Sequence, residues 1–130
     1  MSQIKAYIHY VWATKHRQPF LECFHVRKAL WQHILEYGRD KEIHIDFVNG
    51  YHDHCHCLVS LNGNQTIADI ARLIKGESSY WINKQKLIKD KFAWQREFYA
   101  SSVSESHLDK VREYIKNQER HHSSIIKKQD

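Results

Sequence analysis

Two histidines, His54 and His56, stand one residue apart in the segment from His52 to Leu61 and could hold a metal ion. If the segment is a β-strand, alternate side chains share a face, so the two imidazoles lie roughly 6–7 Å apart along one side. Imidazole is the commonest protein ligand for metals. A solvated polar strand face would give the same pattern, so the spacing alone leaves a metal site and an ordinary strand both open.

A tyrosine near the C-terminal end, Tyr114, is a candidate nucleophile. At about 100° per residue, a helix over this region gathers Leu108, Val111 and Ile115 into one apolar stripe. Tyr114 falls outside that stripe, on a polar face that it shares with Gln118 one turn later. A surface tyrosine with no role beyond solvation is the alternative interpretation.

Together these residues suggest phosphoryl-transfer chemistry. Two imidazole nitrogens and the Gln118 carbonyl oxygen could hold a divalent cation that polarises a phosphodiester. The Tyr114 hydroxyl could then attack phosphorus and form a covalent phosphotyrosine. A phenol is a weak nucleophile near neutral pH, so the hydroxyl would need activation by the cation or by a base. His121 shares the Tyr114 face and is a candidate for proton transfer, against a simple solvated helix end.

The expected cofactor is Mg²⁺ or Mn²⁺. A mixed imidazole and amide ligand set favours Mn²⁺ on affinity. Mg²⁺ prefers shells made of oxygen, and its use would follow from its abundance.

Positive charge gathers in two places and suggests a polyanionic partner. The chain carries a formal net charge of +5, and the stretch 75–96 has six basic residues against two acidic ones, with aromatic residues between them. A basic groove with stacking aromatics suits single-stranded nucleic acid, whereas an ordinary solvated helix would send the same aromatics into the core. The candidate DNA contacts are Lys15, Arg17, Lys75, Lys84 and Arg96.

Hydrophobic periodicity defines the elements that must position these groups. Strands are expected over 4–14, 43–48, 54–61 and 97–104, and helices over 22–40, from Thr66 onward, and from Ser106 to about His122. This order predicts an α+β fold of the ferredoxin-like split βαβ type. Four antiparallel strands would carry two helices on one face, with a C-terminal catalytic helix added.

Local signals predict where several elements start and end. Gly38 is expected to end its helix in a left-handed cap, and Asn49-Gly50 to form a turn. Gly76 interrupts a helix at a cost of about 1 kcal/mol, which indicates a helix break or the close approach of something to the backbone. Two helix starts have the spacing of a capping box: Thr66 with Asp69, and Ser106 with Asp109.

Size and composition indicate one domain over residues 1–130. No apolar run reaches the roughly 20 residues that cross a bilayer, so no membrane association is expected. With no signal-peptide pattern and three cysteines, an odd number, a cytoplasmic protein with reduced thiols is expected. Cys55 and Cys57 would face away from His54 and His56, which disfavours a structural zinc site.

Four segments carry a family resemblance. They are YIHYVWATKHR (7–17), DHCHCLVSL (53–61), LIKGESSYWI (73–82), and FAWQREFYASSVS followed by YIKNQERHH (92–122). In order and spacing the chain resembles the HUH single-strand tyrosine transposases of small bacterial insertion sequences, including relatives that act on repetitive extragenic palindromes.

The resemblance implies roles for particular residues. His54 and His56 would be metal ligands, Gln118 the third protein ligand and Tyr114 the nucleophile. It also implies cleavage and rejoining of single-stranded DNA at hairpin-marked element ends through a 5′-phosphotyrosine. A homodimer is expected, with active sites completed between subunits.

Two other functions fit parts of the pattern. A nucleotide hydrolase of the histidine-triad type also alternates histidines with hydrophobes, but Asp53 stands where such a motif has a hydrophobe. A non-catalytic nucleic-acid-binding module on the same fold is the other alternative.

Overall fold

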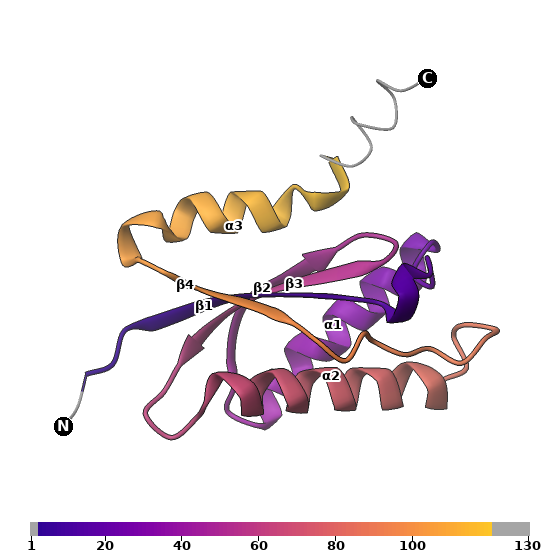
Figure 1. Cartoon of the computed structure of the whole chain (residues 1–130), viewed down its shortest axis with the longest axis horizontal. Helices are drawn as coiled ribbons and strands as arrows, with labels where there is room; N and C mark the ends of the chain where they lie inside the picture. Colours follow the sequence, from indigo (N-terminus) through magenta and orange to yellow (C-terminus); the bar gives the residue numbers. More distant parts are fainter. Residues whose placement is uncertain (1–2, 121–130) are drawn as a thin grey trace.

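The computed structural model describes residues 3–120, which form one sheet with helices on both of its faces (Figure 1). Strands β1 (Ala6–Ala13), β2 (His44–Gly50), β3 (His54–Leu61) and β4 (Tyr99–Val103) pair in the order β2-β3-β1-β4. All three pairings are antiparallel. The strand and helix order confirms the predicted α+β, ferredoxin-like arrangement.

The helices divide between the two faces of the sheet. Helices α1 (Phe24–Asp40) and α2 (Ile67–Lys84) cover one face, and α3 (Leu108–Lys116) crosses the other (Figure 1). Two short 3₁₀ turns, η1 (Lys15–Arg17) and η2 (Glu105–His107), follow β1 and precede α3. The predicted pair of helices on one face with a separate third helix is therefore confirmed.

The main core lies between the sheet and α1 and α2. Alternation along β1 buries Ile8, Tyr10 and Trp12 on this side, and alternation along β3 buries Cys55 and Cys57 there. The helices contribute a row of buried aliphatic residues: Leu30, Ile34, Ile70, Ala71, Ile74 and Ile82. The cysteines therefore behave as small core residues, as their spacing predicts.

A second, smaller apolar cluster lies beneath α3. Leu58 of β3 packs with Leu108 and Ile115 of α3, and half-buried residues such as Phe47 and Val111 surround them. Leu58 shares the strand face of His54 and His56 because all three are separated by even numbers of residues. This cluster seats α3 next to the two histidines.

Gly38 does not form the left-handed cap predicted for it. No glycine among residues 3–120 has a positive φ, and Glu42 takes the left-handed conformation instead, at φ 57°. A Cβ on Gly38 would lie 2.7 Å from Ile45 Cδ1 and 2.9 Å from the Ile43 carbonyl oxygen. Glycine is required here because the start of β2 packs directly against the helix.

Asn49 and Gly50 are strand residues rather than the predicted turn. They close β2, and the connection to β3 runs through 51–53. A Cβ on Gly50 would collide with the His54 carbonyl oxygen, so this glycine permits close approach of the two strands. The turn therefore lies two residues later in the chain than predicted.

One of the two predicted capping boxes forms its cap. The Thr66 hydroxyl accepts a hydrogen bond from the Asp69 amide at 3.1 Å, as expected at the start of α2. Ser106 does not cap α3, which instead follows the 3₁₀ turn η2 and has no side-chain cap. The Ser106 prediction was wrong because the chain tightens into a 3₁₀ turn before the α-helix begins.

Helix α2 continues through Gly76 without a break. Nothing lies within 4 Å of the position that a Cβ on Gly76 would take, so no neighbouring protein atom explains the glycine. Within the described part of the chain, no helix is long and apolar enough to span a membrane.

Candidate active site

The two histidines of the predicted metal site lie together on the face of the sheet that carries α3. His54 and His56 are 8% and 5% exposed, and their ring centroids lie 5.1 Å apart. Neighbouring Cys55 and Cys57 point into the opposite core. The structure thus brings the two imidazoles close enough to face a common point.

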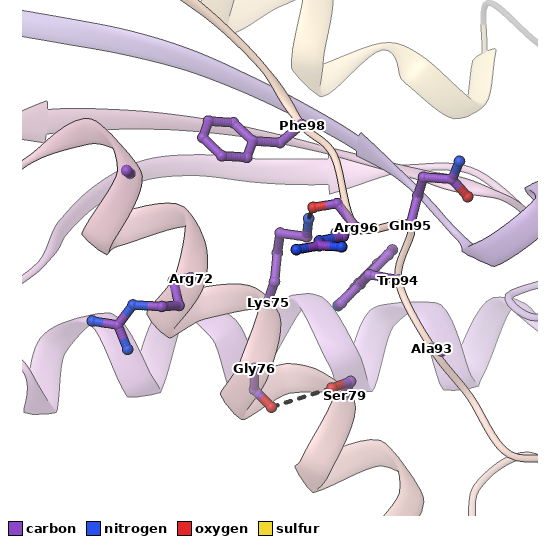
Figure 2. Close-up of a pocket in the computed structure, with 10 residues that line it drawn as sticks. Arg72, Lys75, Gly76, Ser79, Ala93, Trp94, Gln95, Arg96 and Phe98 are labelled. Atoms are coloured by element: carbon purple, nitrogen blue, oxygen red, sulfur yellow. Dashed lines mark hydrogen bonds between the residues drawn. The ribbon is translucent and has the colours of Figure 1, made fainter.

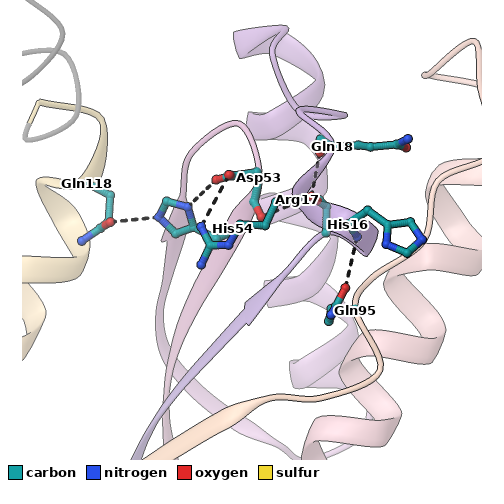
Figure 3. A network of polar contacts seen from close by, with 8 residues as sticks. His16, Arg17, Gln18, Asp53, His54, Gln95 and Gln118 are labelled. Atoms are coloured by element: carbon teal, nitrogen blue, oxygen red, sulfur yellow. Dashed lines mark hydrogen bonds and ion pairs between the residues drawn. The ribbon is translucent and has the colours of Figure 1, made fainter.

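The ring of His54 is held on both sides (Figure 3). Its Nδ1 lies 2.8 Å from the Asp53 carboxylate, and its Nε2 lies 3.3 Å from the Gln118 side-chain oxygen. The carboxylate can accept a hydrogen bond from an N–H group at Nδ1, which holds the ring with its Nε2 side towards Gln118. Arg17 lies 3.5 Å from the other oxygen of Asp53. Asp53 therefore orients the His54 ring with one carboxylate oxygen and pairs with Arg17 of the basic turn η1 through the other.

Helix α3 presents Tyr114 beside this pair. The tyrosine is 53% exposed, and its ring centroid lies 5.6 Å from that of His56. The polar stripe deduced from helical spacing therefore does hold an accessible tyrosine. The residue is thus about half exposed, while its ring lies edge-on to the buried His56 ring.

The backbone changes course directly after α3, and this change positions Gln118. The predicted continuous helix to His122 is interrupted at Asn117, and helical backbone resumes at 118–120. Gln118 is only 1% exposed and donates a hydrogen bond to the Tyr114 carbonyl oxygen at 3.0 Å. Gln118 is thus buried, whereas Tyr114, four residues earlier, is exposed.

Asn49 stabilises the interruption from the neighbouring strand. Its side-chain nitrogen donates to the carbonyl oxygens of Ile115 and Lys116, at 3.0 and 3.1 Å. The last carbonyls of a helix lack internal partners, so a donor here satisfies groups that the break would leave unpaired. Sequence reasoning assigned Asn49 to a turn and missed this contact.

Arg27 of α1 holds the segment that follows. It is 4% exposed, and its Nε donates to Glu119 at 2.9 Å. One of its terminal nitrogens also donates to the carbonyl oxygens of Leu21 and Glu22, at 2.6 and 3.0 Å. A buried guanidinium satisfied in this way fixes the end of the tyrosine-bearing segment against the start of α1.

His9 of β1 is a third histidine at the site, and the sequence analysis did not identify it. Its Nε2 lies 2.9 Å from His56 Nδ1, and its ring stacks on His56 at 5.1 Å between centroids. Burial lowers the pKa of His9 below its ordinary value, which favours the neutral ring. Strand alternation could have revealed it, because Ile8 and Tyr10 face the core and His9 must face the other way.

The candidate DNA contacts do not form one patch. Lys75 and Arg96 line a common pocket, and Arg17 meets Asp53 beside the histidines. Lys84 lies near the end of α2 over the Tyr80 ring, and Lys15 borders a separate hollow with Lys91. His121 lies outside the described residues, so its predicted role in proton transfer stays a prediction.

The candidate metal ligands fit a hard or borderline divalent cation. Among residues 3–120, no cluster of three or more histidine, cysteine or acidic side chains could hold a metal ion, so the candidate set is two imidazoles and one amide. Adjacent ligands in an octahedral shell with bonds of about 2.1 Å lie about 3 Å apart. The observed 3.3 Å between His54 Nε2 and Gln118 Oε1 is compatible with that spacing.

Comparison with known families now identifies the chain. The model of the family described as "Transposase IS200 like" matches residues 2–118. The chain therefore belongs to the IS200-like transposases, as its resemblance to that group predicted. A search of curated protein sequences finds no match.

Solved structures show the same fold. A candidate transposase from Deinococcus radiodurans R1 has a TM-score of 0.72 and 22% identity, covering 90% of this chain and 93% of that one. A REP-associated tyrosine transposase bound to a REP hairpin has a TM-score of 0.59 and 20% identity, covering 88% of this chain and 68% of that one. At these identities the likeness concerns the fold.

Proposed function

We propose that this protein cleaves and rejoins single-stranded DNA at hairpin-marked element ends, with Tyr114 as the nucleophile. One observation carries the proposal: His54 Nε2 faces the Gln118 oxygen at 3.3 Å, with the exposed Tyr114 ring 5.6 Å from His56. A polar, oriented cluster next to an accessible phenol is what phosphodiester transesterification needs. Membership of a transposase family makes DNA the natural substrate.

The covalent steps exchange one phosphoester bond for another. The Tyr114 oxygen forms a bond to phosphorus and loses its proton, and the bond from phosphorus to the 3′-oxygen breaks. The 3′-oxygen takes up a proton, which leaves a free 3′-hydroxyl and a 5′-phosphotyrosine. In rejoining, a 3′-hydroxyl attacks the phosphotyrosine and the tyrosine oxygen leaves. Because each step exchanges one phosphoester bond for another, the strand can be rejoined without an external energy source.

His54, His56 and Gln118 would hold Mg²⁺ or Mn²⁺, which would polarise the phosphodiester and offset its developing charge. The chain's own contribution is orientation. Asp53 contacts the Nδ1 side of His54, and His9 contacts the Nδ1 side of His56, so each ring is oriented from its Nδ1 side. Partners of this kind fix the tautomer and orientation of ligating histidines.

Hairpin DNA and a second copy of the chain are the proposed partners. The REP hairpin bound to the structural relative supports a hairpin as substrate. In this structure α3 places Tyr114 beside the histidines of its own chain. The proposed homodimer would complete its sites either in this arrangement or by exchanging α3 between subunits.

The experiment is incubation of the protein with a labelled single-stranded hairpin oligonucleotide and Mn²⁺ or Mg²⁺. A covalent protein–DNA band that needs the divalent cation is expected. Tyr114→Phe should abolish the band, because the phenol oxygen is removed, and should retain DNA binding and thermal stability because the ring is exposed. Tyr99→Phe is the matched control, since Tyr99 on β4 is also exposed, at 61% against 53% for Tyr114.

The outcomes separate the possible functions. Normal cleavage by Tyr114→Phe would show that the nucleophile is wrong. Specific hairpin binding by the wild-type protein without any adduct would favour a non-catalytic binding module.

A further inference from the structure

Gly76 is a residue that neither the fold nor the proposed chemistry explains. It lies within the continuous helix α2, where glycine costs about 1 kcal/mol relative to alanine. Beyond its own helical backbone and chain neighbours, no atom of residues 3–120 lies within 4 Å of a Cβ at this position, so packing there does not exclude a larger side chain. An exposed helical glycine without a packing reason is a place where a ligand can approach the backbone closely.

Gly76 forms part of the floor of a pocket between α2 and the segment that leads into β4 (Figure 2). The pocket has a volume of about 360 Å³, within the usual range for ligand sites. Its lining combines cationic and aromatic side chains: Arg72, Lys75, Arg96, Trp94 and Phe98. None of the lining residues within 3–120 is acidic.

Hydrogen bonds hold the walls of the pocket, while its two arginines, Arg72 and Arg96, are exposed to solvent. Trp94 donates from its indole nitrogen to Ser78 at 2.9 Å, and Lys75 donates to the Arg96 and Glu97 carbonyl oxygens at 2.8 and 3.2 Å. Arg72 makes a long, exposed contact with Asp69 at 3.4 Å, which costs little to exchange. The Phe98 ring is 37% exposed, and the Lys75 ammonium lies 5.6 Å from its centroid, so a base packed at this ring would also lie beside a cation.

A line of contacts joins this pocket to the candidate active site on the other face of the sheet. The pocket residue Gln95 accepts a hydrogen bond from the His16 amide at 3.1 Å, and the next residue, Arg17, contacts Asp53 (Figure 3). His16 and Arg17 both have a positive φ, 55° and 53°, a strained pair that displays exposed basic side chains. The basic turn η1 therefore lies between the pocket and the histidines.

We propose that the Gly76 pocket binds one unpaired nucleotide of the DNA strand whose scissile phosphate lies at the active site. The base packs against Phe98 and the edge of Trp94, its phosphate meets Arg96 and Arg72, and the backbone at Gly76 admits close approach. Basic side chains beside aromatic rings are the usual combination for single strands. The inference rests on the proposed function, since it takes the ligand to be DNA.

The test compares two labelled hairpins, one blunt and one with a single-stranded extension, by fluorescence anisotropy with a chelator present to prevent cleavage. Wild-type protein should bind the extended hairpin at least about tenfold more tightly, since one stacked base contributes on that scale. Gly76→Leu places a side chain in the pocket and should reduce the ratio of the two affinities, extended over blunt hairpin, to about one. Gly76→Ala should keep the ratio and melt at a higher temperature.

A second pair of variants keeps the test independent of how Gly76→Leu folds. Arg96→Gln removes a pocket cation and should lower the ratio several-fold. Lys84→Gln removes the same charge from the end of α2, outside the pocket, and should weaken both hairpins equally. Single abasic sites placed along the extension should identify one position whose loss matters in wild type and no longer matters in Gly76→Leu.

An unchanged ratio in folded Gly76→Leu, or equal loss in Arg96→Gln and Lys84→Gln, would overturn the pocket assignment. So would a wild-type protein that does not distinguish the two hairpins. The covalent-adduct assay reports separately on catalysis. Adduct formation without a pocket effect would reject only this inference, and a pocket effect without adduct would reject only the proposed chemistry.

Discussion

The two faces of the sheet are built from the same strands but are held to their helices in different ways. On the side of α1 and α2, β3 contributes Cys55 and Cys57 to a core of fully buried apolar side chains. On the side of α3, the same strand contributes His54 and His56, and among residues 3–120 the apolar cluster beneath the helix has three buried members, Leu58, Leu108 and Ile115. Alternate residues of β3 thus serve the main core and the candidate active site.

Polar contacts compensate for the small apolar cluster under α3. Arg112 pairs with Asp46 of β2 at 2.7 Å, Asn49 binds the last carbonyls of the helix, and Arg27 holds Glu119 beyond it. These contacts are directional, so they fix where Tyr114 and Gln118 lie. The face that carries α1 and α2 therefore mainly stabilises the fold, and the face that carries α3 mainly positions Tyr114 and Gln118 relative to the histidines.

The largest stability effect is expected from a truncation on the helix-covered face. Ile74→Ala removes a side chain that is 1% exposed in the main core. Loss of its transfer energy and the cavity left behind should destabilise the protein by about 2–5 kcal/mol. Chemical denaturation followed by circular dichroism measures this. The folded variant should bind Mn²⁺ with the same affinity as wild type. A lower Mn²⁺ affinity would mean that the main core also determines the geometry of the candidate metal site.

A metal-affinity effect is expected on the α3 face from Asp53→Asn. An amide in place of the carboxylate weakens the contact that orients His54 Nδ1, and loss of such a partner lowers metal affinity about 10–100-fold. Titration calorimetry with Mn²⁺ measures the change. Asp46→Asn is the matched control, because Asp46 pairs with Arg112 and does not contact His54. Equal losses in both variants would mean that Asp53 acts through general charge and not through His54.

Much of the two-faced arrangement was predictable because alternation along a strand is a local property. The parity of His54 and His56 against Cys55 and Cys57, and the apolar stripe of the last helix, follow from backbone geometry alone. The same parity would have placed His9 at the site. Its position on the neighbouring strand depends on the β1–β3 register, in which His9 lies opposite Leu58, two residues from His56.

Contacts that depend on tertiary packing escaped prediction. Gly38 and Asn49-Gly50 carry standard cap and turn residues, yet packing of β2 against α1 and against β3 determines their roles. The interruption at Asn117 has no local signal such as glycine or proline. The Ile115 and Lys116 carbonyl oxygens just before it are bound by Asn49, which is 68 residues before Asn117 in the chain, so no local pattern could reveal this contact.

The smallest expected effect on stability is the most specific to the tyrosine segment. Asn49→Ala removes the donor to the Ile115 and Lys116 carbonyl oxygens and should cost about 1–2 kcal/mol locally. Since the helix end would then lack its partner, amides of 108–120 should exchange hydrogen faster by mass spectrometry, while those of α1 and α2 stay protected. Adduct formation should slow because Tyr114 and Gln118 lose their fixed position relative to His54.

Asn62→Ala serves as the control for this variant. Asn62 also makes a side-chain bond to backbone, to the Asn64 amide at 2.8 Å, but it lies in the loop between β3 and α2. Its loss should leave exchange in 108–120 unchanged. If Asn49→Ala also leaves exchange in that segment unchanged, the apolar cluster alone positions α3, and the polar contacts would not be what keeps the site in register. Faster exchange in 108–120 without slower adduct formation would instead show that the segment's rigidity is not required for catalysis.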